Sequence, residues 1–152
     1  MSYKNIIVAI DGSETSSLAL SEAIELSKSL QAKLSIIYVV DEFPVNNIAL
    51  GIDFDRYREE MIKEGTQILD TAKQIAKKSD LAVEAELVEI EDAEKNISKK
   101  IIETVLKLKS DLLVLGTHGR GGFNRLILGS VAEETIRVSP IPVLLVRAKE
   151  KS

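Results

Sequence analysis

Residues 110–138 read SDLLVLGTHGRGGFNRLILGSVAEETIRV. The apolar run at 110–116 is typical of a buried strand, and Ser130–Val138 has the pattern of a short helix. The loop between them is rich in glycine, which lets a backbone approach an anion, and the N–H groups at a helix start attract negative charge. This stretch therefore predicts a strand, a phosphate-binding loop and a helix in succession.

The rest of the chain repeats this alternation of short β-rich runs and longer amphipathic runs. Further strands are predicted at Asn5–Ile10, 33–40, 81–88 and 141–147, and a long helix at 55–78. The first strand is followed by another amphipathic pattern, for which Ser13 or Thr15 could be the N-cap. A fourth helix is predicted from the apolar stripe of Ile97, Ile101, Val105 and Leu108.

Five strands joined by right-handed helical crossovers form a doubly wound parallel sheet. We expect an α/β fold with the strand order 3-2-1-4-5 and four helices in three α/β/α layers. The length of 152 residues fits a single domain, and we place it at residues 1–152.

The composition excludes several classes of function. The chain has no cysteine and one histidine, which rules out thiolate chemistry and a histidine-cluster metal site. A net charge of −4 does not favour a nucleic-acid partner. No apolar run approaches the roughly 20 residues that span a bilayer, and the N-terminus lacks the apolar core of a signal peptide. We expect a cytoplasmic protein that does not enter a membrane.

Ligands of doubly wound sheets bind beyond the carboxyl ends of the strands, where the strand order reverses. This rule selects Asp11, Val39 and the loop at Gly116. Two known phosphate motifs are excluded, because the chain has no Gly-Lys pair for a Walker loop, and the first strand-to-helix turn has one glycine where a Rossmann fingerprint has three. A receiver-type phosphoacceptor is not favoured either, because Glu89 stands where an aspartate would end the third strand.

The spacing Gly-x2-Gly-x9-Gly-Ser, formed by Gly116, Gly119, Gly129 and Ser130, resembles the ATP-binding branch of the universal stress protein family. The resemblance extends to VAIDGS at residues 8–13 and PVLLV at residues 142–146. It therefore covers both ends of the chain with matching spacing.

The resemblance implies that the chain binds ATP, or ADP or AMP, with Mg²⁺ or Mn²⁺ bridging the phosphates. Asp11 would hydrogen-bond the ribose or adenosine side of the ligand, the Val39 backbone would meet the adenine, and the loop and helix start would hold the phosphates. The implied nucleotide-binding residues are Asp11, Val39, Gly116, Gly119, Arg120, Gly122, Gly129, Ser130 and Val131. Arg120 and Gly122 enter this set as loop backbone beside Gly119.

This resemblance implies a nucleotide-dependent switch or sensor in the stress response. The sequence contains no discernible set of catalytic residues, so we expect at most weak ATPase activity and name no catalytic residue. The alternatives are a slow ATP hydrolase or another nucleotide-handling enzyme of the same α/β class, and a scaffold that binds no nucleotide. The intact glycine motif argues against the scaffold.

The last predicted strand raises the question of oligomerisation. At the edge of a sheet, residues 142–147, from Pro142 to Arg147, would expose an apolar row of unpaired backbone groups. A symmetric partner would cover that edge. We therefore expect a homodimer formed through this strand, which the resemblance also implies.

Overall fold

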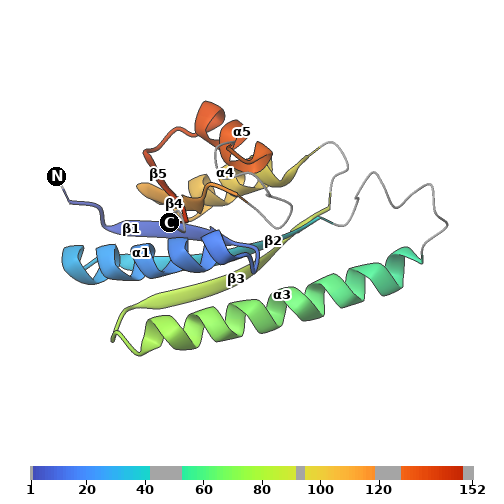
Figure 1. Cartoon of the computed structure of the whole chain (residues 1–152), viewed down its shortest axis with the longest axis horizontal. Coiled ribbons are helices and arrows are strands. Elements are labelled where there is room, and N and C mark those ends of the chain that lie inside the picture. The colour runs from blue at the N-terminus through green and yellow to red at the C-terminus, as the bar shows by residue number, and fades with distance from the viewer. Residues whose placement is uncertain (1, 42–52, 92–94, 119–127, 149–152) are drawn as a thin grey trace.

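The computed structural model of the chain describes residues 2–41, 53–91, 95–118 and 128–148. Strands and helices alternate along these ranges (Figure 1). In chain order the elements are β1 (Asn5–Ile10), α1 (Glu14–Leu30), β2 (Lys33–Asp41), α3 (Phe54–Lys77), β3 (Val83–Ile90), α4 (Ile97–Lys107), β4 (Leu112–Gly116), α5 (Ser130–Val138) and β5 (Val143–Val146).

The five strands form one parallel sheet in the order β3-β2-β1-β4-β5, which confirms the predicted topology. The central strand β1 has consecutive buried residues, Ile6, Ile7 and Val8, with 1% or less of their surface exposed. Successive side chains of a strand point to opposite faces, so both faces of the sheet are covered here. A continuous apolar run is the expected sequence of such a strand.

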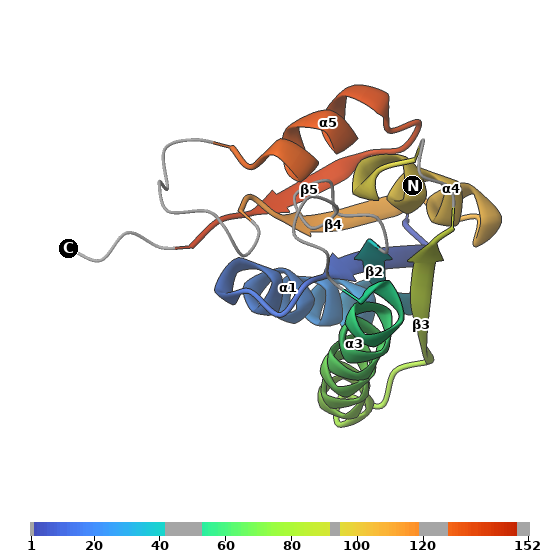
Figure 2. The same cartoon turned by 90° about the vertical axis from the view of Figure 1, so that its right-hand side faces the viewer.

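Helices cover the two faces of the sheet in separate pairs, as Figure 2 shows. Ile6 and Val8 of β1 share one core cluster with Leu20 of α1 and Ala72 of α3. Ile7, which points the other way, belongs to a second cluster on the α4 side of the sheet. That cluster also contains Ile101 and Val105 of α4, with Val131 of α5 packed against it. The fold is therefore the expected α/β/α arrangement.

The largest shift of an element's bounds concerns β3, which begins and ends two residues later than predicted. The acidic composition of residues 89–94 predicts a connector, but Glu89 and Ile90 pair with Val40 and Asp41 of β2. Ile90 is fully buried as a result. The pairing partner, rather than the acidic composition of the segment, determines where this strand ends.

In the long helix, apolar residues at steps of mostly three and four, from Tyr57 to Ala76, predict one buried stripe that includes Ile75. In the structure, 47% of the surface of Ile75 is exposed. Leu69 is buried instead, with 5% of its surface exposed. The face of α3 that packs on the sheet is therefore rotated slightly from the predicted stripe.

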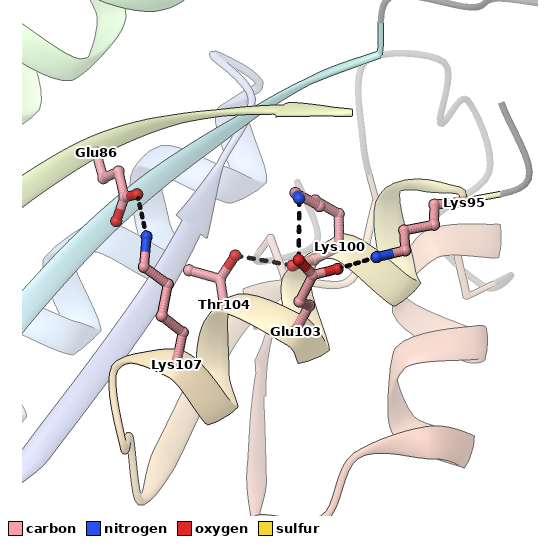
Figure 3. A network of polar contacts seen from close by, with 6 residues as sticks. All are labelled: Glu86, Lys95, Lys100, Glu103, Thr104 and Lys107. Carbon is pink, nitrogen blue, oxygen red and sulfur yellow. Dashed lines mark hydrogen bonds and ion pairs between the residues drawn. The ribbon is translucent and has the colours of Figure 1, made fainter. Parts of the chain in front are cut away.

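Charged side chains of α4 form ion pairs with each other, with Lys95 and with β3 (Figure 3). Lys107 pairs with Glu86 of β3 at 3.1 Å, and Glu103 accepts hydrogen bonds from Lys95 and Lys100. These two bonds lower the pKa of the Glu103 carboxyl. Because these groups are partly exposed to solvent, each pair contributes at most about 1 kcal/mol to stability.

The sequence places Glu91, Asp92 and Glu94 near the start of the fourth predicted helix, where their charges would complement the helix dipole. Asp92 and Glu94 lie outside the described residues. The first turn of α4 contains no acidic residue, and the side chain of Asn96 caps it by accepting a hydrogen bond from the Lys99 N–H at 2.9 Å.

Candidate functional site

A cavity of about 520 Å³ opens where β1, β2 and β4 end. This volume lies in the usual range of small-molecule sites, about 300–1,000 Å³. Its lining includes six of the predicted site residues, which are Asp11, Val39, Gly116, Gly129, Ser130 and Val131. The other three, Gly119, Arg120 and Gly122, lie outside the described residues.

Asp11 directly follows β1 and is held by the turn into α1. Its Oδ1 accepts a hydrogen bond from the Ser13 N–H at 2.8 Å, and its own N–H donates to Ser16 Oγ at 3.2 Å. Ser13 is the N-cap of α1, since its side chain accepts from the Ser16 N–H. An ionised carboxylate has about four acceptor sites, so Asp11 can also accept hydrogen bonds from a ligand hydroxyl.

Val39 lies where β2 extends beyond its neighbour β1. The pairing between these strands ends at Ile10 and Tyr38, whereas β2 remains paired with β3 as far as Asp41. From residue 39 onward, the edge of β2 that faces β1 therefore has no backbone partner in β1. A planar ligand with donors and acceptors along its edge could pair with the backbone there.

The first turn of α5 also lines the cavity. Gly129 is its N-cap and has no side chain, so no side-chain hydrogen bond caps this helix. The first N–H groups of a helix have no partner within it, and they carry the positive end of the helix dipole. Together with the Ser130 hydroxyl, they form a suitable site for an anion such as phosphate.

Gly116, at the end of β4, packs against the first turn of α1. A Cβ atom at this position would lie 2.7 Å from Thr15 Oγ1 and 2.9 Å from the Thr15 carbonyl carbon, which is closer than real contacts allow. Glycine is therefore required here by the approach of a helix. The sequence suggested only the approach of an anion as the reason.

Two helices contribute cavity-lining residues that are not among the predicted site residues. Tyr57 and Met61 come from α3, and Ile97 and Ile101 come from α4. Burial raises the pKa of Tyr57, with smaller contributions from the negative charges of Asp41 and Glu64. Its phenol therefore stays protonated at neutral pH. The apolar periodicity of the two helices predicts all four only as core positions, and no sequence signal indicates their place in the site.

The charges of the described lining are negative, from Asp11 and Asp41, and this part of the lining contains no lysine or arginine. His118 also lines the cavity, with its Nδ1 2.9 Å from Thr117 Oγ1. Within the described ranges, no group of three or more His, Cys, Asp or Glu residues could hold a metal ion. Those same ranges contain no helix with the length and apolar content to cross a membrane.

Comparison with known proteins gives a consistent result. The model of the universal stress protein family matches residues 2–147. A universal stress protein of Methanocaldococcus jannaschii is 34% identical, with 98% of this chain and 85% of that protein covered. A crystal structure from the same family, from Burkholderia pseudomallei, has a TM-score of 0.79 and 32% identity, with 96% of this chain and 97% of that one covered.

A further crystal structure shows a universal stress protein in complex with cAMP. It has a TM-score of 0.68 and 25% identity to this chain, with 97% of this chain and 98% of that one covered.

Proposed function

This chain belongs to the universal stress protein family, and we propose that it binds an adenine nucleotide at the carboxyl end of its sheet. One observation carries the proposal: a single cavity joins the Asp11 carboxylate, the Val39 backbone and the start of α5. These three parts suit the ribose, the base and the phosphates in turn. The cAMP complex of a structural neighbour supports the same class of ligand.

We place the adenosine against Asp11 and Val39, and the phosphates against Gly129, Ser130 and Val131. Gly119, Arg120 and Gly122 would complete the phosphate site through their backbone. ATP is the ligand that we propose first, with ADP or AMP as alternatives in the same site.

The described lining offers few groups that could neutralise a triphosphate. No lysine or arginine belongs to it, and no cluster of metal ligands was found among the described residues. The arrangement fits a Mg²⁺ or Mn²⁺ ion held mainly by the phosphates and water, because Mg²⁺ commonly keeps several waters beside a few ligands. Such an ion would supply charge neutralisation, and the chain would orient the nucleotide.

The activity that we infer is a nucleotide-dependent switch or sensor in the stress response, acting in the cytoplasm. Turnover of the bound ATP would be slow at most. Measurement of ADP release in the presence of Mg²⁺ separates this switch from the alternative, a slow ATP hydrolase.

The direct test is to release the ligand from freshly purified protein and identify it by ultraviolet absorbance and mass spectrometry. The chain has no tryptophan and three tyrosines, so adenine absorbance would be clear. We expect an adenine nucleotide in a near-stoichiometric amount. Protein that is recovered empty and also shows no calorimetric binding of added ATP with Mg²⁺ would contradict the proposal.

We also propose a homodimer formed through β5 and its flanking residues, from Pro142 to Arg147. β5 lies at one edge of the sheet, and its four apolar residues are only half-buried within the chain. An exposed apolar edge of this kind favours pairing with another strand.

A further inference from the structure

The Thr15 side chain joins the first turn of α1 to the segment that follows β4. Its hydroxyl donates a hydrogen bond to the backbone carbonyl of His118, the last described residue before residue 119. Thr15 is 7% exposed, so this bond is shielded from water. The Thr15 hydroxyl also lies 3.5 Å from Oγ of Ser13, the N-cap of α1, so it contacts both segments.

A second contact places Thr15 at the same point. Its side chain lies so close to Gly116 that no Cβ fits between them. This packing involves the Thr15 backbone as well as its side chain. Two observations therefore fix the start of α1 against the end of β4 and the two residues that follow it.

Other bonds hold the neighbouring backbone to different elements. The Thr117 N–H donates to the Val146 carbonyl at 2.9 Å, and the Thr117 carbonyl accepts from the Gly129 N–H at 2.7 Å. These bonds attach Thr117 to β5 and to the N-cap of α5. Thr15 adds a bond to α1, which begins just after Asp11.

We propose that Thr15 is a positioning residue for the phosphate end of the site. It holds the backbone at His118 where the glycine-rich segment begins, and it links this backbone to the turn that carries Asp11. Backbone that is already held in place loses less freedom when it binds a ligand. This role rests on the proposed nucleotide binding, and it predicts that Thr15 affects the affinity for phosphates more than the affinity for the nucleoside.

The test compares Thr15→Val, which keeps the shape but removes the hydroxyl, with Thr15→Ser, which keeps the hydroxyl. By calorimetry with Mg²⁺, we expect Thr15→Val to bind ATP about tenfold more weakly, the scale of one hydrogen bond, and adenosine within about twofold of wild type. Thr15→Ser should restore most of the ATP affinity. An equal loss for ATP and adenosine, or no loss, would overturn the proposal.

Thr104→Val is a matched control. The Thr104 hydroxyl is also buried and also donates to a backbone carbonyl, that of Lys100 at 2.8 Å, but within α4. Thr104 is not among the residues that line the cavity. This variant should keep the wild-type affinities for ATP and adenosine.

Amide exchange in nucleotide-free protein provides a readout that needs no ligand. The N–H groups of Thr117 and Gly129 should exchange faster in Thr15→Val than in Thr104→Val. Unchanged exchange would overturn the link between Thr15 and this backbone. If wild-type protein bound neither ATP nor adenosine, the proposed function would fall, and the role of Thr15 in nucleotide binding would fall with it.

Discussion

Gly65 shows how tertiary packing can require a residue that a helix disfavours. Glycine in a helix interior costs about 1 kcal/mol relative to alanine. A Cβ atom at residue 65 would lie 2.7 Å from Tyr38 Cδ1 and 2.8 Å from Leu87 Cδ1. The middle of α3 thus approaches β2 and β3 so closely that only a hydrogen atom fits. In the sequence, this glycine only weakens the prediction of a helix.

Gly65→Ala should lower the free energy of unfolding by about 1–3 kcal/mol, the usual cost of overpacking, despite the better helix propensity of alanine. The buried ring of Tyr38 cannot move away easily. Urea denaturation measures the change. As a control, Leu87→Ala makes room beside residue 65, so it should cost less stability in the Gly65→Ala background than in wild type. Strictly additive losses would argue against the steric explanation.

The start of α5 is the element on which the proposed phosphate site depends. Gly129 has φ −62° and ψ 152°, an extended conformation that any residue can adopt. Asp and Asn are equally good N-caps, and each should stabilise the helix by a few tenths of a kcal/mol relative to glycine. Asp adds a negative charge where we place the phosphates.

Gly129→Asp and Gly129→Asn are therefore a matched pair. Both side chains would occupy N–H groups of the first turn, so both should weaken ATP binding. The charge should weaken it by a further factor of about ten, which corresponds to 1.4 kcal/mol. Adenosine affinity should differ little between the two variants. Calorimetry with Mg²⁺ measures both ligands, and equal ATP affinities for Asp and Asn would place the phosphates elsewhere.

Prediction from sequence succeeded best for elements with a clear pattern of their own. The predicted bounds of β1 and α5 agree with the structure. The edge strand β3 is different, because acidic and apolar residues alternate along it, and its pairing with β2 determines where it ends. Where the end of an element depends on a partner strand, the sequence of that element alone does not predict it.

The candidate site shows the same contrast between residues that the sequence predicts and residues whose place depends on packing. Asp11 and Val39 could be predicted because parallel strands end at one edge of a sheet. The positions of Tyr57 and Met61 depend on how α3 packs against that sheet, which the spacing of its apolar residues does not specify. The sequence therefore indicated where the cavity lies, but not all of its walls.

At the scale of the whole molecule, the strand order explains how distant residues line one cavity. β1 and β4 are neighbours at the centre of the sheet. The chain leaves β1 toward α1 on one face, and α5, which follows β4, lies on the opposite face (Figure 2). The two connections diverge, and a ligand site forms between them. This divergence brings Asp11 and Ser130 into the same lining.

The same strand order leaves β5 at one edge of the sheet, where some of its backbone groups face outward, away from β4. The Pro142 carbonyl accepts from the Leu113 N–H at 3.0 Å, and the Val146 carbonyl accepts from the Thr117 N–H at 2.9 Å. Backbone groups of alternate residues in a strand point to opposite sides, so residues 142, 144 and 146 face β4. The backbone groups of Val143 and Leu145 consequently face the open edge.

Leu145→Pro should weaken the proposed dimer without removing a bond between β4 and β5. Proline lacks the N–H that faces outward at this position, and edge strands tolerate it. We expect the dimer dissociation constant to rise at least about tenfold, the scale of 1.4 kcal/mol, in sedimentation experiments from nanomolar to micromolar concentration. Leu145→Ala, which loses a similar side chain but keeps the N–H, should remain closer to wild type. A wild-type monomer at micromolar concentration, or equal dissociation constants for the two variants, would show that β5 does not pair in this way.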